Sequence, residues 1–116
     1  MTSVGQDTGL FTIADPQVDT VAHTVMRGDD LIELPPLSFR LLRVLAEAAP
    51  AVVSHDELVS RVWAGRVVGP ETVRQRVKLL RQTLGDDAQH PRYIGLVRGV
   101  GYQLIAAPRE AAAPFV

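Results

Sequence analysis

The spacing of hydrophobic side chains changes twice along the chain and divides it into three parts. Short apolar runs separated by turn residues predict an antiparallel sheet of about three strands, at residues 10–14, 21–26 and 31–34. Apolar residues then recur at helical spacings of three and four up to residue 84. After that the period returns to two, at residues 93–97 and 102–106, which predicts two final strands.

Three helices are expected in the middle part, and particular residues mark their ends. The first follows two prolines and stops before Pro50, since proline cannot continue a helix. The second begins at a capping box, in which the Ser54 hydroxyl accepts from the Glu57 amide and the Glu57 side chain reaches back. The third covers residues 70–84, with proline at its first position and Gly85 as a left-handed cap.

The third helix is predicted to have two opposed faces. Its apolar positions are spaced four, three and four apart and form one stripe: Val73, Val77, Leu80 and Leu84. The opposite face is polar and mostly cationic: Glu71, Arg74, Gln75, Lys78, Arg81 and Gln82. A glycine-containing turn at residues 98–101 then joins the last two strands as a hairpin that needs positive φ. A helix-turn-helix followed by a hairpin predicts an α+β winged-helix fold.

Length and composition indicate one domain, expected over residues 10–106, with a flexible N-terminus at 1–9 and a flexible tail or linker at 107–116. Trp63 and Tyr102 are expected in its core. No apolar run approaches the roughly 18 residues of a membrane span, and no secretory signal is recognisable. With no cysteine in the chain, we expect a cytoplasmic protein.

Charge is unevenly distributed, although the net charge is only −1. Residues 1–60 contain three basic and nine acidic side chains, whereas residues 61–98 contain eight basic and three acidic ones. The near-neutral total argues against a nucleic-acid ligand. The asymmetry argues for one, because it can concentrate positive potential on one face.

The predicted fold gives the cationic side chains a use in binding double-stranded DNA. The major groove admits one α-helix, where arginine and lysine donate to guanine and glutamine pairs with adenine. We therefore expect base contacts from Arg74, Gln75 and Lys78 in the third helix. Arg98, at the hairpin tip, is expected in the minor groove. Phosphate contacts, which position a protein without specifying sequence, are expected from Arg66, Thr72, Arg76 and Arg81.

Several segments together resemble the winged-helix DNA-binding domain of OmpR/PhoB-type regulators. They are LVSRVW at 58–63, ETV at 71–73, VKLL at 77–80, LGDD at 84–87, PRYI at 91–94 and VRGVGY at 97–102. The resemblance covers about residues 10–106, and its most specific part is VRGVGY following LGDD. The segment RVVGPETV is also similar to CadC-like members, which lack a receiver domain.

The resemblance implies binding to promoter DNA in bacterial transcription control, often as head-to-tail pairs on direct repeats. It also implies contact between RNA polymerase and the loop at residues 64–69, and it leaves open that the domain is the cytoplasmic part of a longer, membrane-anchored regulator. Two departures limit what can be transferred. Pro35 and Ser38 stand where the family usually has a Thr–Glu capping pair, and Leu79 stands where relatives often have a DNA-contacting arginine.

The alternative is a winged-helix module that binds proteins and not DNA, favoured by the nine acids of residues 1–60 and by Leu79. Catalysis has no comparable support. The three histidines lack metal-ligand spacing, and Gly99-x-Gly101 has neither the third glycine nor the following helix of a dinucleotide site. Asp86 and Asp87 fit turn chemistry better than a metal pair. We therefore expect no enzyme activity, no metal and no cofactor.

Overall fold

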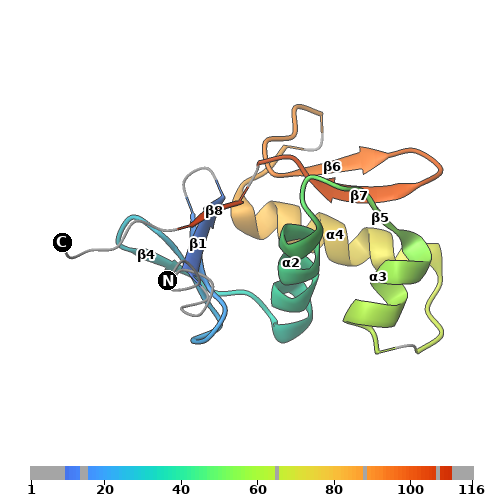
Figure 1. Ribbon diagram of the computed structural model, residues 1–116, viewed down its shortest axis with the longest axis horizontal. Helices are drawn as coiled ribbons and strands as arrows, with labels where there is room; N and C mark the ends of the chain where they lie inside the picture. The colour runs from blue at the N-terminus through green and yellow to red at the C-terminus, as the bar shows by residue number, and fades with distance from the viewer. Residues whose placement is uncertain (1–9, 14–15, 65, 88, 107, 111–116) are drawn as a thin grey trace, which may run out of the picture.

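The computed structural model describes residues 10–13, 16–64, 66–87, 89–106 and 108–110. In chain order its elements are β1 (Leu10–Ile13), β2 (Gln17–Asp19), β3 (Thr24–Arg27), β4 (Asp30–Ile32), α2 (Pro36–Ala48), β5 (Val53–Ser54), α3 (His55–Val62), α4 (Pro70–Leu84), β6 (Ile94–Val97), β7 (Gly101–Leu104) and β8 (Pro108–Glu110). Within these residues, two antiparallel sheets and three helices make up the fold (Figure 1). The predicted winged-helix class is confirmed.

The first sheet has the strand order β4-β3-β2-β1-β8 and is larger than predicted. The predicted strand at 21–26 is wrong in its first half, because residues 20–23 form a turn and the chain pairs already at β2. The Asp19 carboxylate accepts from the amides of Val21 and Ala22 at 2.9 and 3.0 Å, which turns the chain after β2. Val18 and Val25 then face each other, both fully buried.

The prediction of a flexible tail from residue 107 is wrong for strand β8. This strand pairs with β1, with Phe11 opposite Glu110 and Ile13 opposite Pro108. Without it, one side of β1 would be a sheet edge with unpaired backbone groups. The alanines and prolines of the tail gave no alternating pattern from which this pairing could be predicted. Residues 1–9, 107 and 111–116 lie outside the described residues.

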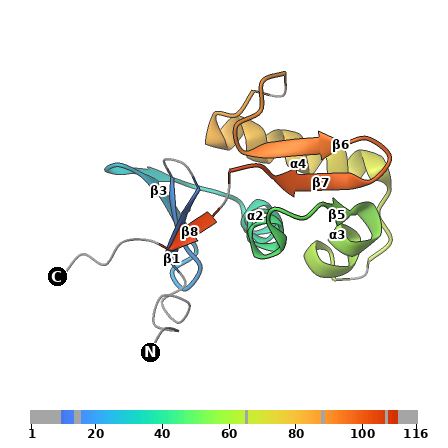
Figure 2. The same cartoon turned by 45° about the horizontal axis from the view of Figure 1, so that its top comes forward.

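Helix α2 lies between the two sheets and packs against α3, α4 and β7 (Figure 2). Three of its buried side chains, Leu41, Leu42 and Leu45, are completely shielded from solvent. The predicted apolar stripe of α4 also lies in this core, with each member at most 1% exposed. Trp63 is buried as predicted, and Tyr102 is partly buried against the core.

The predicted helix ends are largely confirmed. Ser54 Oγ accepts from the Glu57 amide at 3.1 Å, which caps α3. The Glu57 carboxylate, expected to reach back to the cap, lies instead 3.8 Å from the Arg61 guanidinium one turn later. Gly85 ends α4 with φ of 76°, a left-handed conformation that favours glycine.

Candidate nucleic-acid interface

Helix α4 exposes one face to solvent along its length. Its buried stripe packs on the core, so the residues opposite that stripe point outward. Arg74, Gln75 and Lys78 are all exposed, and their spacings of one, three and four place them on the same side of the helix. The three predicted base-contacting residues are therefore brought together.

An ion pair lies at the N-terminal end of this face. Arg74 Nη1 donates to Glu71 Oε1 at 2.7 Å, and the two side chains are 65% and 80% exposed. Glu71 is the one acidic residue in the sequence of α4. The pair places a strong acceptor next to a strong donor on the surface.

Arg76 and Arg81 lie at the borders of the buried stripe and are only partly exposed. Arg76 Nη1 donates to the hydroxyl of the buried Ser38 on α2 at 3.4 Å. Arg81 Nη2 donates to the backbone oxygen of Ile94 on β6 at 2.9 Å, and its Nε is buried without a protein partner. Each arginine joins α4 to a neighbouring element, a use that the sequence did not reveal.

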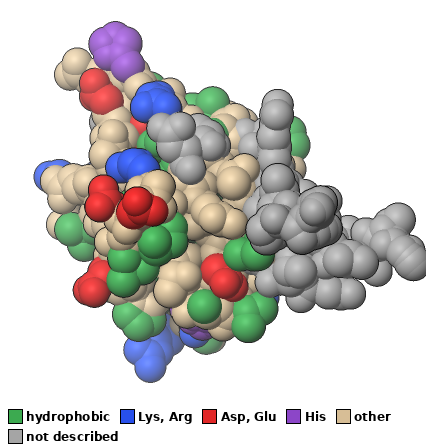
Figure 3. Space-filling model, turned by 90° about the vertical axis from the view of Figure 1, so that its left-hand side faces the viewer, with side chains coloured by type: hydrophobic (Ala, Val, Ile, Leu, Met, Phe, Trp, Pro, Cys, Tyr) green, Lys and Arg blue, Asp and Glu red, His purple; other side chains and the backbone are tan. Residues whose placement is uncertain are grey.

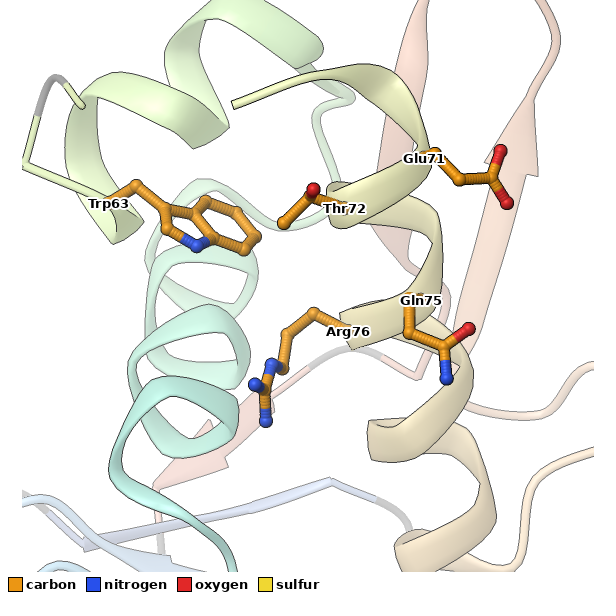
Figure 4. Close-up of a pocket in the computed structure, with 5 residues that line it drawn as sticks. All are labelled: Trp63, Glu71, Thr72, Gln75 and Arg76. Carbon is orange, nitrogen blue, oxygen red and sulfur yellow. The ribbon is translucent and has the colours of Figure 1, made fainter. Parts of the chain in front are cut away.

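A surface hollow lies beside the first turns of α4, lined by Trp63, Glu71, Thr72, Gln75 and Arg76. Figure 4 shows Thr72 turned toward the Trp63 ring, with Arg76 on the same side of the helix. Glu71 and Gln75 project from the other side. Thr72 is exposed, and its amide donates to Gly69 O at 3.1 Å, within the first turn.

The hairpin of β6 and β7 runs alongside α4, and its tip reaches toward the N-terminal end of that helix (Figures 1 and 2). The turn places Arg98 on the surface, next to Gly99 with φ of 74°. The predicted need for positive φ is confirmed at Gly99 alone; Gly101 is required for a different reason, its close approach to the Val53 backbone. The turn that contains Arg98 therefore lies toward the N-terminal end of α4, where Arg74 is also found.

The segment between α3 and α4 is the third part of this end. Arg66 is exposed, and its amide donates to the Trp63 oxygen at 3.0 Å. Val67, next to it, is fully exposed. Residue 65, within the predicted polymerase-contacting loop at 64–69, lies outside the described residues.

The opposite end of the molecule carries exposed acidic side chains. Figure 3 faces this end and shows acidic and hydrophobic side chains together with several basic ones. Asp29, Asp30 and Glu33, which flank or begin β4, are exposed. The acidic excess of residues 1–60 thus includes side chains on the sheet that lies away from the tip of the hairpin.

Comparison with known proteins identifies the family of this chain. Residues 28–104 match the model of the family described as "Transcriptional regulatory protein, C terminal". The chain belongs to the OmpR/PhoB-type DNA-binding domains. The family description is that of the C-terminal part of transcriptional regulators.

Members of this OmpR/PhoB-type family are similar to the chain in sequence and in structure. The response regulator MtrA of Mycobacterium tuberculosis is 37% identical over 95 residues, covering 81% of this chain and 42% of MtrA. The DNA-binding domain of Escherichia coli CadC has a TM-score of 0.77 at 27% identity and covers 89% of this chain and 97% of its own. The Klebsiella pneumoniae RstA domain, solved in complex with its RstA box, has a TM-score of 0.76 at 27% identity, covering 82% and 95%. The chain spans less than half the length of MtrA.

Two residues that hold this OmpR/PhoB-type domain together were not among the predicted site residues. The Asp86 carboxylate accepts from the amides of Arg92, Tyr93 and Ile94 at 2.7, 3.3 and 3.0 Å and so fixes the start of β6. Arg27 Nη2 donates to Leu84 O at 2.6 Å, which connects β3 to the end of α4. The role of Asp86 could have been predicted from its position directly after the helix-ending Gly85. Nothing in the sequence indicated the contact of Arg27.

In the described part of the chain, every helix is too short or too polar to span a bilayer. In the same residues, no group of three or more histidine or carboxylate side chains is placed to hold a metal ion.

Proposed function

We propose that this chain binds double-stranded promoter DNA sequence-specifically, as the DNA-binding part of a bacterial transcription regulator. The observation that carries the proposal is the two-sided structure of α4, with its apolar stripe buried and Arg74, Gln75 and Lys78 exposed opposite it. Family membership supports the same function, and so does the likeness to the RstA domain solved with its DNA box.

In this proposal α4 enters the major groove and the hairpin lies at the minor groove. Arg74 and Lys78 donate to guanine, and Gln75 pairs with adenine. Arg98 enters the minor groove, where narrow A·T-rich segments attract cations. Arg66 and Thr72 are the exposed candidates for phosphate contacts, and Arg76 and Arg81 are the half-buried ones.

Further parts of the proposal concern partners and context. The loop at residues 64–69, with its exposed Val67, is proposed to contact RNA polymerase. Two copies are proposed to bind head to tail on direct repeats. The domain is proposed to act in the cytoplasm, either alone or as the cytoplasmic part of a longer, membrane-anchored regulator. Neither the family match nor the similar solved structures add support for the alternative, a winged-helix module that binds proteins and not DNA.

Selection of bound duplexes from a random DNA pool tests the proposal directly. A recurring sequence is expected, and its repeat pattern reports the arrangement of the copies. Affinity for the selected site should then fall with salt, with a logarithmic slope of about −0.9 per neutralised phosphate. Absence of a selected sequence, or affinity that does not change with salt, contradicts DNA binding.

A matched pair of variants tests the hairpin. Arg98→Ala should weaken binding to the selected site, because it removes a cation from the groove. Arg43→Ala removes the same charge from an exposed residue of α2 that is paired with Glu47, and it should leave affinity unchanged. Equal affinities of the two variants for the selected site would show that Arg98 of the hairpin does not contribute to DNA binding.

A further inference from the structure

The acidic residue on the proposed DNA-contacting face of α4 has no role in the function described so far. Glu71 is 80% exposed and lies on the same side of the helix as Gln75 and Lys78. A carboxylate on such a face repels phosphates and weakens sequence-independent binding. Its contribution to folding is small, because exposed pairs three residues apart on a helix stabilise it only slightly.

The ion pair gives Glu71 a defined partner. Arg74 Nη1 and Glu71 Oε1 are 2.7 Å apart, so an acceptor and a donor stand side by side on the outer face. A G·C base pair presents the complementary arrangement in the major groove. Guanine O6 accepts, cytosine N4 donates, and the hydrogen bond that joins them is about 2.9 Å long.

We propose that Glu71 and Arg74 act as one specificity unit that selects a G·C base pair, with Arg74 donating to guanine O6 and N7 and Glu71 accepting from cytosine N4. This inference rests on the proposed function, with α4 in the major groove. Cytosine is favoured over adenine because the adenine amino group lies beside the N7 acceptor, which repels a carboxylate. Thymine presents an acceptor at O4 and is rejected by Glu71.

The test compares duplexes of the selected site in which one base pair is changed through all four possibilities. The wild-type chain should prefer G·C in one orientation, at one position, by about tenfold or more. Glu71→Ala should reduce that preference below about threefold and strengthen binding to unrelated DNA, since a negative charge is removed. Glu71→Gln should reduce the penalty for a T·A pair, in which adenine replaces the cytosine, because an amide can donate to N7 and accept from N6. The T·A pair should still bind more weakly than G·C, because Arg74 loses the O6 and N7 acceptors of guanine.

The control is Glu33→Ala, which makes the same change in charge at an exposed residue of the opposite end. It should leave the base preference intact. Melting temperatures of all variants should stay close to that of the parent, so that changes in preference are not caused by unfolding.

A double-mutant cycle tests the coupling of the two side chains. If the two side chains contact the same base pair as a unit, their effects on the preference for G·C should not be independent. The fold loss of that preference in Glu71→Ala/Arg74→Ala should then be smaller than the product of the fold losses in the two single variants. The inference is overturned, while DNA binding stands, if the sequence selected by the wild-type chain contains no such G·C pair. It is overturned likewise if the preference for G·C persists in Glu71→Ala. Absence of any DNA binding overturns the proposed function itself.

Discussion

Gly101 determines how closely β5 and β7 approach, and replacing it tests the packing that supports the hairpin. It is the Cα partner of Ser54 in the three-stranded sheet. A Cβ at this position would lie 1.9 Å from the backbone oxygen of Val53 and 2.9 Å from the Ser54 Cα. Since ordinary contacts begin at 3.4 Å, Gly101→Ala forces the two strands apart by about 1.5 Å.

That separation is enough to break the pairing of β5. An N–H···O bond of about 2.9 Å stretched by this amount is no longer a hydrogen bond. Each lost bond costs about 1 kcal/mol, and reduced burial of the Val53 side chain costs about 1–2 kcal/mol more. We expect Gly101→Ala to lower the free energy of unfolding by about 2–4 kcal/mol.

Urea denaturation followed by the fluorescence of Trp63, the one tryptophan of the chain, measures the effect. The matched control is Gly99→Asn, two residues earlier. Gly99 has φ of 74° but open space around a Cβ, and asparagine tolerates that conformation, so the loss should stay below about 1 kcal/mol. Equal losses for the two variants would refute the steric explanation of Gly101.

Two further substitutions test contacts that fix helix α3 and strand β6. Ser54→Ala removes the acceptor of the Glu57 amide and should lower stability by about 1 kcal/mol, whereas Ser54→Thr retains a hydroxyl and should lose less. Asp86→Asn replaces one carboxylate oxygen by a donor, and both oxygens accept from backbone amides, those of Asp87 and Arg92 on one side and of Tyr93 and Ile94 on the other. This variant should lower the free energy of unfolding by about 1–3 kcal/mol, measured by thermal unfolding. A melting temperature equal to that of the parent would show that these bonds do not stabilise the fold.

The sequence predicts α4 well because the signals that determine it are local. The apolar spacing, Pro70 at its start and Gly85 at its end act within the helix itself, and the structure has the predicted bounds. The outward direction of Arg74 and Lys78 follows from the same spacing, since residues opposite a buried stripe must face solvent. That part of the candidate site was therefore predictable.

The remaining differences depend on partners far away in the sequence. Strand β8 forms because β1, nearly 100 residues earlier, offers an unpaired edge, and no periodicity in three residues encodes that. Arg81 is another example, because its contact with Ile94 depends on how β6 packs beside α4. In the sequence Arg81 and Lys78 are equivalent cations three residues apart, and only packing separates them.

The basic residues of α4 therefore differ in how much of their side chain is available for binding DNA. Arg76 and Arg81 flank the buried stripe, so each has a neighbour of the fold within reach and uses part of its guanidinium there. Removing either one would leave the Ser38 hydroxyl or the Ile94 carbonyl without that donor, and stability and affinity would change together. Arg66 and Lys78 are exposed instead, so their removal changes phosphate or base contacts without that loss. We therefore expect the number of phosphate contacts counted from the salt dependence of affinity to be smaller than the number of basic residues in this half of the chain.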